Sequence, residues 1–465
     1  MRIGIVGAGL TGLAAGRALA RAGHQVVVAE QAPEPGGLAG TFAYGGTRLE
    51  MFYHHIFTTD LETIRFIRDL GLSDRLLWRE TPMGIYSQGR LQKFATPWDL
   101  LRFRPLSPAN RLRFGLCILY LSRVKRWRGY EQVRAKDWIL RAFGQQAWDV
   151  IWGPLLHGKF GDYANDIGMP WFYSRIHTRA GSREQGMMKE SLGYLQGSFQ
   201  VLHEALAAEI TARGGRVRCG ESVRSLIVEQ GRVAGWRTSR GRERLDAVLA
   251  TQAPPALWPM LPANLGGDYW DRLRQVEYLG NVCAVLTLKR SLSPIYWMNV
   301  PDLASPFIAV IEHTNFIRPE TYGGRHVLYL SSYVPTRHPR YRAGDDAVLH
   351  EFYAYLSRVV PGFEPSDVLE TRVFRAPYAQ PVIRTGFGER LVPHPAPLSG
   401  LFLANMAQIY PEDRGMSYSL RLGLRVAQDI LKYEPPAAVP AARRTARIKI
   451  KLKDQGGKAR VKSRR

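Results

Sequence analysis

The first thirty residues constrain the fold most, because they order a strand, a glycine turn, a helix and a second strand. Residues 2–6 read Arg-Ile-Gly-Ile-Val and predict a buried strand, which leads directly into the turn Gly7-x-Gly9-x-x-Gly12. After a helical stretch, the next apolar run predicts a second strand that ends at Glu30. A G-x-G-x-x-G turn in this setting is the fingerprint of a dinucleotide-binding βαβ unit. The chain is therefore predicted to be an α/β protein with a Rossmann-type domain.

Each glycine of this turn meets a physical need. Gly7 allows the chain to turn sharply out of the strand, Gly9 removes a side chain where backbone approaches a pyrophosphate, and Gly12 lets the helix lie close to the sheet. The phosphates are expected on free N–H groups at the helix N-terminus. Glu30 is expected to accept the ribose hydroxyls, and its charge disfavours a 2′-phosphate and therefore NADP.

A second glycine loop follows Glu30 at once. Residues 36–41 read Gly-Gly-Leu-Ala-Gly-Thr, where an NAD domain would usually proceed to its next helix and strand. This loop resembles the second flavin-contacting loop of the amine oxidase superfamily, which includes protoporphyrinogen oxidases and carotenoid desaturases. The resemblance implies noncovalent FAD as the cofactor and a flavin that accepts a hydride from the substrate.

Later segments keep the order of that family. Residues 214–223 resemble the strand whose backbone holds the adenine in relatives, with Val223 as the contact. Residues 400–406 and 414–419 resemble the closing strand and the helix whose N-terminus faces the flavin pyrimidine. The chain departs from the family at Asn405-Met406, where relatives usually have Gly-Asp for the ribityl hydroxyls, so that contact would come from Asn405, Asp413 or a backbone group. The resemblance extends from residue 1 to about residue 433.

These arguments together define a cofactor site. The residues predicted to bind FAD are Gly7, Gly9, Leu10, Thr11, Gly12, Glu30, Gln31, Gly36, Gly37, Leu38, Val223, Asn405, Gly415, Met416 and Ser417.

The resemblance also implies two interleaved domains, which agrees with a length of 465 residues. A discontinuous FAD-binding domain is predicted over residues 1–85, 191–251 and 385–433. An α+β substrate domain, built from a mixed sheet plus helices, is predicted over residues 86–190 and 252–384. Residues 282–288 and 326–330 within it show the alternation of strands, and residues 110–128 predict a helix.

Four polar and aromatic stretches are expected where the substrate domain meets the flavin: residues 50–57, 159–163, 375–381 and 408–414. His54, His55, Tyr378 and Tyr410 are the candidate catalytic residues. Imidazole titrates near neutrality, so the histidines are candidates for moving protons, and the tyrosines would form an aromatic wall. A flavin carries the redox chemistry itself, so no acid–base triad is needed, and the sequence contains no Ser/His/Asp or Cys/His constellation.

The cysteine content and the lengths of the apolar runs narrow the classes of site and of cellular location that the chain can have. The three cysteines, Cys117, Cys219 and Cys283, lack the spacing of a metal site or a disulfide framework, so no metal is predicted. The fingerprint begins at residue 7, and no apolar run reaches the ~18 residues of a spanning helix. These features predict that the chain has neither a signal peptide nor a membrane span. They predict a cytoplasmic location.

The formal net charge of +24 predicts anionic partners. Residues 443–465 contain eleven basic residues and one acid, Asp454, and residues 434–465 are predicted to be a disordered basic tail. Residues 98–130 combine an apolar centre with basic ends and aromatics, which suits peripheral contact with the inner face of a membrane. Nucleic acid is the less favoured partner of the tail.

Two alternatives to a lipophilic-substrate oxidoreductase stay open. Residues 55–59 also resemble a stretch of the UDP-galactopyranose mutases, flavoenzymes without net redox, in which Arg175, Arg179 and Arg183 would bind a diphosphate. The other alternative is a noncatalytic flavin-bearing adaptor for membrane or nucleic acid. The sequence does not determine the substrate, the electron acceptor or the oligomeric state.

Overall fold

The computed structural model describes residues 1–181 and 191–435. Residues 1–433 form one compact unit of helices and sheets, which confirms the predicted α/β class. Residues 436–465, and with them nearly all of the predicted basic tail, lie outside the described residues.

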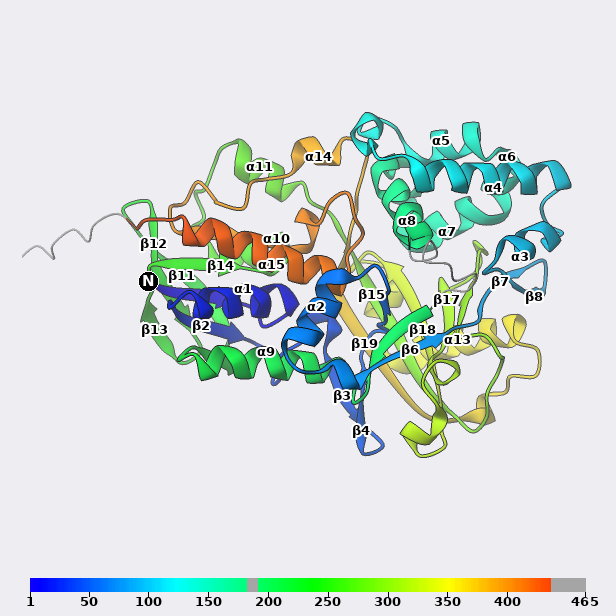
Figure 1. Ribbon diagram of the computed structural model, residues 1–465, viewed down its shortest axis with the longest axis horizontal. Helices are drawn as coiled ribbons and strands as arrows, with labels where there is room; N and C mark the ends of the chain where they lie inside the picture. The colour runs from blue at the N-terminus through cyan, green and yellow to red at the C-terminus, as the bar shows by residue number, and fades with distance from the viewer. Residues whose placement is uncertain (182–190, 436–465) are drawn as a thin grey trace, which may run out of the picture. The chain divides into compact units, whose positions relative to one another are not determined.

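A five-stranded parallel sheet contains the predicted fingerprint (Figure 1), with strand order β10-β2-β1-β14-β20. Its strands are β1 (Arg2–Val6), β2 (Gln25–Glu30), β10 (Arg216–Cys219), β14 (Ala247–Ala250) and β20 (Leu401–Leu403). The inner strands are buried nearly end to end, which explains why they read as continuous apolar runs. Because all five strands run parallel, Gly7, Glu30, Thr251 and Ala404 follow their carboxyl ends at one edge of the sheet.

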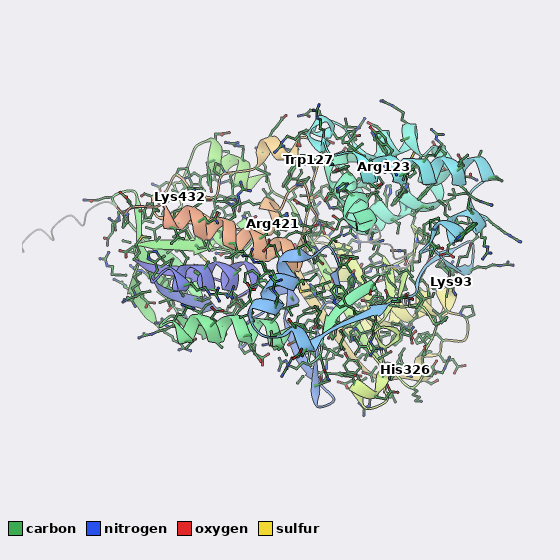
Figure 2. The ribbon with its side chains drawn as sticks, viewed as in Figure 1. Lys93, Arg123, Trp127, His326, Arg421 and Lys432 are labelled. Atoms are coloured by element: carbon green, nitrogen blue, oxygen red, sulfur yellow. The ribbon has the colours of Figure 1, made fainter. Side chains whose placement is uncertain are left out.

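Three long helices accompany this sheet (Figure 1): α1 (Leu10–Arg21), α9 (Gln200–Ala212) and α15 (Met416–Leu431). Helix α15 crosses α1 at backbone contact distance, because a Cβ at Gly423 would lie 2.3 Å from the carbonyl oxygen of Thr11. The other side of α15 is basic and exposed, with Arg421 and Lys432 among its side chains (Figure 2).

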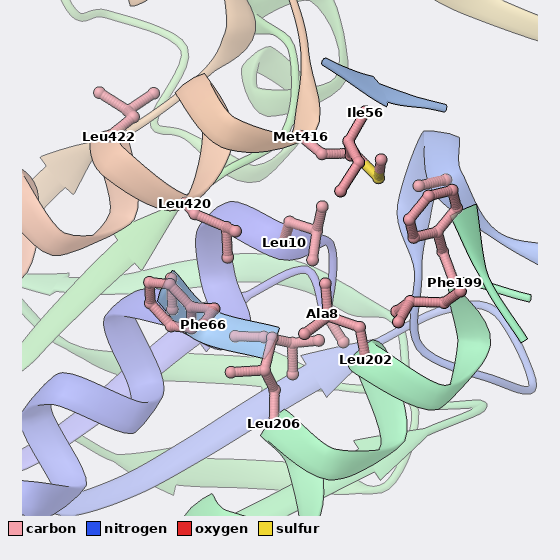
Figure 3. Close-up of a cluster of buried hydrophobic side chains, with 14 of the residues drawn as sticks. Ala8, Leu10, Ile56, Phe66, Phe199, Leu202, Leu206, Met416, Leu420 and Leu422 are labelled. Carbon is pink, nitrogen blue, oxygen red and sulfur yellow. The ribbon is translucent and has the colours of Figure 1, made fainter. Parts of the chain in front are cut away.

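Apolar side chains from several elements anchor the start of α1. Leu10 is 5% exposed and belongs to one buried cluster with Leu202 of α9 and with Met416 and Leu420 of α15. Figure 3 shows these side chains around the turn that begins α1. Burial of such side chains stabilises the fold by ~2 kcal/mol each. The packing therefore fixes the start of α1 against α9 and α15.

A seven-stranded sheet has the order β19-β15-β18-β17-β16-β7-β8. Its strands are β7 (Met83–Ser87), β8 (Arg90–Lys93), β15 (Tyr278–Leu288), β16 (Trp297–Asn299), β17 (Ala309–Glu312), β18 (His326–Val334) and β19 (Val368–Pro381). All neighbours are antiparallel except β16 and β7, so the sheet is mixed, as expected. Helix α13 (Asp345–Val359) packs its buried side chains on those of β15 and β18.

Smaller sheets link these parts of the chain. They are the hairpin β3 (Thr41–Tyr44) and β4 (Thr47–Glu50); the sheet of β5 (Ile56–Phe57), β9 (Ser191–Leu195) and β6 (Leu76–Glu80); and the sheet of β11 (Val223–Glu229), β12 (Arg232–Thr238) and β13 (Gly241–Arg244). Strand β7 crosses the predicted domain boundary at residue 85. The remaining boundaries stay predictions.

A group of helices lies between β8 and β9 in the chain. They include α3 (Pro97–Arg102), α4 (Pro108–Arg123), α5 (Ala135–Ala142), α7 (Gly153–Phe160) and α8 (Met169–Gly181). Helix α4 ends five residues before the predicted end at residue 128. Val124 adopts an extended conformation, and its carbonyl accepts a hydrogen bond from the Tyr173 hydroxyl, so the helical path cannot continue. Among the described helices, none has the length and apolarity needed to cross a bilayer.

Candidate functional site

The glycine turn after β1 is crowded at Gly7 and Gly12. Gly7 has φ +103°, a conformation that favours glycine, and its N–H donates to the carbonyl of Ala29 at 2.8 Å. A Cβ at Gly12 would lie 2.1 Å from the carbonyl oxygen of Gly7. The close approach predicted from the sequence therefore depends on both glycines.

The second glycine loop lies directly against the first. The N–H of Gly36 donates to the carbonyl of Ala8 at 3.0 Å, and a Cβ at Gly37 would lie 3.2 Å from the Cα of Gly9. Gly37 is exposed and Leu38 is half-buried. Two loops that are thirty residues apart thus form one glycine-lined cradle at the edge of the parallel sheet.

Glu30 is held in place by backbone donors. Its Oε2 accepts from the N–H of Ala8 at 2.7 Å and its Oε1 from the N–H of Ala32 at 2.9 Å. Each carboxylate oxygen accepts more than one hydrogen bond, so capacity for ribose hydroxyls remains. The carbonyl of Glu30 accepts from the N–H of Glu221 at 2.8 Å, which brings the segment leading to buried Val223 alongside. Gln31 lies exposed beside it.

The start of α1 supplies donors to the cradle. The first hydrogen bond within the helix runs from the N–H of Leu13 to the carbonyl of Gly9 at 3.0 Å. By helix geometry, the N–H groups of Leu10, Thr11 and Gly12 have no acceptor within the helix. Such groups favour anionic phosphates.

The predicted pyrimidine side lies at the start of α15. Gly415 is extended and precedes Met416 and Ser417, both buried, and the hydroxyl of Ser417 accepts from the N–H of Thr63 at 3.4 Å. Asn405 is also buried, but its Oδ1 accepts from the N–H of Ala407 at 3.0 Å in a capping box. The side-chain oxygen of Asn405 therefore serves a local turn, and its predicted ribityl contact would fall to the amide N–H groups.

The two candidate histidines do not titrate near neutrality. Burial lowers the pKa of His54 to about 4 and that of His55 to about 3. The Nδ1 of His54 lies 2.6 Å from the carbonyl of Phe52, and the Nδ1 of His55 lies 3.0 Å from the hydroxyl of Tyr296. Both rings are therefore neutral at pH 7, and their catalytic role stays a prediction.

The two candidate tyrosines have different partners. Tyr410 packs against Trp127, with ring centroids 5.5 Å apart, and its hydroxyl donates to Glu131 at 2.7 Å. Tyr378 packs against Tyr278 at 5.9 Å. The contacts of the described residues thus give each tyrosine its own surroundings, and a shared aromatic wall stays a prediction.

Glu50, the first residue of the predicted stretch 50–57, is a buried carboxyl group that the sequence did not single out. It is 1% exposed and accepts from the hydroxyl of Tyr194 at 2.8 Å and from the N–H of Phe199 at 2.9 Å. Burial raises its pKa to about 7, against these hydrogen bonds.

The other three predicted stretches converge on a basic cluster, which we define as Lys159, Arg175, Gln380, Asp413 and Arg414. The Asp413 carboxylate lies 3.0 Å from the Nζ of Lys159 and 3.4 Å from the Nη1 of Arg175. It also accepts from Gln380 at 3.3 Å and from the N–H of Arg414 at 3.0 Å. Helix α7 positions Lys159, α8 positions Arg175, β19 positions Gln380, and the loop before α15 positions the rest.

The pKa values in this cluster follow from its excess of positive charge. Burial, together with the charges of Arg175 and Arg414, lowers the pKa of Lys159 to about 8 against the attraction of Asp413. Although burial favours the protonated acid, the three cations hold the pKa of Asp413 well below its usual range. Lys159 is therefore still largely charged at pH 7, and Asp413 is fully ionised.

Aromatic and histidine side chains connect the basic cluster to stretch 50–57. Arg414 donates to the hydroxyl of Tyr333, whose own ring lies 5.5 Å from the Nζ of Lys159. The charge of Arg414 contributes to the low pKa of His54, and the charges of Arg179 and Arg175 contribute to that of His55. All four predicted stretches therefore meet in one region. Arg183, the third candidate for diphosphate binding, lies outside the described residues.

The family profile of flavin-containing amine oxidoreductases matches residues 10–431, which is most of the chain and includes the end of the first glycine loop and all of the second. The chain belongs to this family. A flavin is accordingly its cofactor, and the glycine cradle, the free N–H groups of α1 and the fixed Glu30 carboxylate fit such a nucleotide.

A probable zeta-carotene desaturase of Synechococcus elongatus is 26% identical over 297 residues, which is 56% of this chain and 60% of that relative. The chain thus matches under two thirds of the relative's length. A putative protoporphyrinogen oxidase from Exiguobacterium superposes with a TM-score of 0.72 at 20% identity, covering 92% of this chain and 98% of the other. A reduced UDP-galactopyranose mutase also gives 0.72, at 16% identity, covering 92% and 95%. At these identities the structural likeness shows the fold.

Proposed function

We propose that this protein binds FAD noncovalently and oxidises a lipophilic small molecule by hydride removal, as desaturases and related oxidoreductases do. The observation that supports it most is the meeting of the two glycine loops at the carboxyl edge of the parallel sheet, beside the fixed carboxylate of Glu30. Ligands of open α/β sheets bind at this edge.

Different residues of this chain would bind different parts of the FAD. Glu30 would hold the adenosine ribose, the first turn of α1 would hold the phosphates, and Gly415 to Ser417 would face the pyrimidine ring. When bound, the flavin supplies the acceptor for a hydride. Neutral His54 and His55 would form a dry wall with Tyr296 and its neighbours, which excludes water and orients the substrate.

Two observations support a lipophilic substrate. The curated relative named above is a probable zeta-carotene desaturase. The walls around His55 are aromatic, with Phe57 at 5.0 Å and Trp297 at 5.7 Å between ring centroids. Aromatic surfaces bury large apolar ligands efficiently.

The test begins with the purified protein. We expect a yellow protein whose flavin is released by denaturation and identified as FAD by chromatography. Anaerobic addition of lipophilic polyenes, porphyrinogens and amines, one at a time, should bleach the visible flavin band with one of these classes. A colourless protein that refuses added FAD would end this proposal.

A mutase-like function is the second candidate, supported by the basic cluster and by the likeness to the UDP-galactopyranose mutase fold. The two candidates separate in one experiment. An oxidoreductase consumes substrate with the oxidised flavin, whereas a mutase requires reduced flavin and a nucleotide sugar and shows no net redox change. Turnover of UDP-galactopyranose by the dithionite-reduced protein would favour the mutase.

We also propose that the protein contacts the inner face of the membrane through residues 98–130. Among the described residues, six of the twelve exposed large apolar side chains lie there: Trp98, Leu101, Leu112, Leu116, Leu119 and Tyr120. A groove of about 530 Å³ opens among several of them, lined also by Trp138 of α5. Lys93, Arg123 and Trp127 lie in the same part of the chain (Figure 2). Such a surface suits an anionic bilayer.

Sedimentation with phosphatidylglycerol vesicles tests this contact. Leu116→Glu should reduce binding, because it places a charge in the apolar surface, whereas Leu369→Glu, at an exposed leucine of β19, should not. Equal sedimentation of both variants and the unaltered protein would contradict it.

A further inference from the structure

The basic cluster has more positive charge than it needs to hold its own carboxylate. In the described part of the chain, three cations, Lys159, Arg175 and Arg414, converge on Asp413. A buried charge that lacks a partner is costly, so the excess of positive charge at this largely buried cluster calls for an anion. Within residues 1–181 and 191–435, the contacts at the cluster supply one carboxylate.

The cations also keep donors and surface available. Arg175 contacts Asp413 through Nη1, yet its side chain is 35% exposed, and a guanidinium has five N–H donors. Lys159 is 15% exposed and has three donors, one of which is directed to Asp413. Both side chains therefore have N–H donors that are not directed to Asp413, and both are accessible to solvent.

Apolar rings lie beside these donors. The Nζ of Lys159 lies 5.4 Å from the ring of Trp171 and 5.5 Å from that of Tyr333. Arg414 continues directly into Gly415 and Met416, where α15 begins. A ligand held at the cluster would thus have its charged end on the cations and its apolar part along the aromatic rings, next to the predicted flavin edge.

We propose that the substrate is an amphiphile with an anionic head group, a carboxylate or a phosphate ester, and that Lys159 and Arg175 bind that group. This inference rests on the proposed function only for the identity of the site, because it concerns binding and not the oxidation itself. Arg414 acts as a positioning residue, since it bonds Gln380 at 3.0 Å and Tyr333 and so fixes the wall of the cluster.

The test is a set of equilibrium titrations of the oxidised holoprotein, read as a shift of the visible flavin spectrum and repeated by calorimetry. The probes are hexadecanoate, hexadecyl phosphate and hexadecanol, which share one chain and differ in the head group. We expect the two anions to bind more tightly than the alcohol. Removing one charged hydrogen bond should weaken anion binding about ten- to a hundred-fold.

The variants are Lys159→Met and Arg175→Met, with Arg421→Met as the matched control. Arg421 lies on α15, is paired with Glu412 and is 52% exposed, so its loss should leave anion binding unchanged. Arg175→Met is the decisive variant, because its half-exposed side chain can be replaced with little cost to folding. In the unaltered protein, anion affinity should also fall as the pH rises through about 8, where Lys159 loses its proton.

Each outcome either supports or overturns the proposed anion-binding site. Selective loss of anion binding in Arg175→Met, with hexadecanol unaffected, supports the inference even if no probe is oxidised, in which case the proposed function fails alone. Equal binding of the three probes, or equal loss in Arg175→Met and Arg421→Met, overturns it even if neutral lipids are oxidised. Binding of UDP-galactose without binding of either hexadecyl anion overturns it as well, in favour of a nucleotide sugar.

Discussion

The glycine cradle and the basic cluster lie at opposite extremes of how a site is assembled. The cradle comes from two loops within residues 7–40, holds its shape through backbone contacts, and depends on the absence of side chains. The basic cluster takes side chains from α7, α8, β19 and the loop before α15, and depends on their charges. The first recognises what every nucleotide has, and the second is free to select a particular substrate.

The difference teaches where specificity can change. A Cβ at Gly12 or Gly37 meets backbone atoms that cannot move aside, whereas the cluster tolerates a new side chain if charge is balanced. We therefore expect substitutions in the cradle to act through geometry, and those in the cluster to act through electrostatics and to respond to pH and salt. The following predictions test that contrast, from the largest effect to the smallest.

Asp413→Asn should have the largest effect on stability. It removes the carboxylate that Lys159 and Arg175 contact, and an unpaired charge in the interior costs about 3 kcal/mol. The free energy of unfolding, from urea titration, should fall by that amount at pH 7. The double variant Asp413→Asn with Lys159→Met should recover part of the loss. As a control, Asp271→Asn removes an exposed partner of Arg274 and should cost under about 1 kcal/mol. Equal losses of unfolding free energy in Asp413→Asn and Asp271→Asn would contradict the claim that the basic cluster depends on its charges.

Glu50 should make stability fall as the pH rises from 4.5 to 7. Its carboxyl ionises near 4.5 in the unfolded chain but only near 7 in the folded protein, so the folded state binds more protons in this window. Glu50 contributes about 3 kcal/mol to the free energy of unfolding below pH 4.5, and this contribution is fully lost above pH 7. The buried histidines give the opposite slope in both proteins, so the test is the difference in the free energy of unfolding between the unaltered protein and Glu50→Gln, from urea titrations at several pH values. This difference should fall by that amount as the pH rises from 4.5 to 7. A variant with the same slope would contradict the assignment to Glu50.

Gly12→Ala should damage the cradle. The new Cβ would lie 2.1 Å from the carbonyl oxygen of Gly7, and overpacking of this kind costs about 2 kcal/mol. FAD retention after gel filtration should fall with it, and neither loss should depend on salt. Gly266→Ala, at a glycine with no heavy atom within 4 Å of the added Cβ, should change stability by less than about 0.5 kcal/mol. Normal FAD retention in Gly12→Ala would show that the turn does not bind the cofactor as proposed.

Arg421→Met should have the smallest effect. Its ion pair with Glu412 lies on the exposed side of α15, where screening by water limits its value to under about 1 kcal/mol. The change in unfolding free energy should vanish in high salt, unlike that of Gly12→Ala. A loss as large as that of Asp413→Asn would mean that the basic cluster extends along α15.

How well each region can be predicted from the sequence depends on the same difference between local and long-range contacts. The first βαβ unit, the second glycine loop and the strands β15 and β18 were predictable, because each is encoded by local pattern over a short span. Asn405 was harder, since its capping role depends on Ala407 and Gln408 as well as on the preceding strand. The end of α4 was missed because it depends on Tyr173, fifty residues away along the chain.

The histidines show a different limit. The sequence predicts their place in the site region, but their pKa values depend on burial and on charges from α8 and from Arg414. No sequence pattern reports desolvation at a particular ring. The stretches 159–163, 375–381 and 408–414 were likewise identified one by one, without any sign that Lys159, Gln380 and Asp413 touch.

The sequence by itself determined the family, the class of fold and the nucleotide cradle, because glycine spacing, an acid after a strand and apolar runs act on neighbouring residues. Only the tertiary structure decided that Lys159 and Arg175 share the Asp413 carboxylate and that the histidines are neutral. The physical reason is that charge interactions depend on distance and burial in space, and these are set when segments more than two hundred residues apart come into contact.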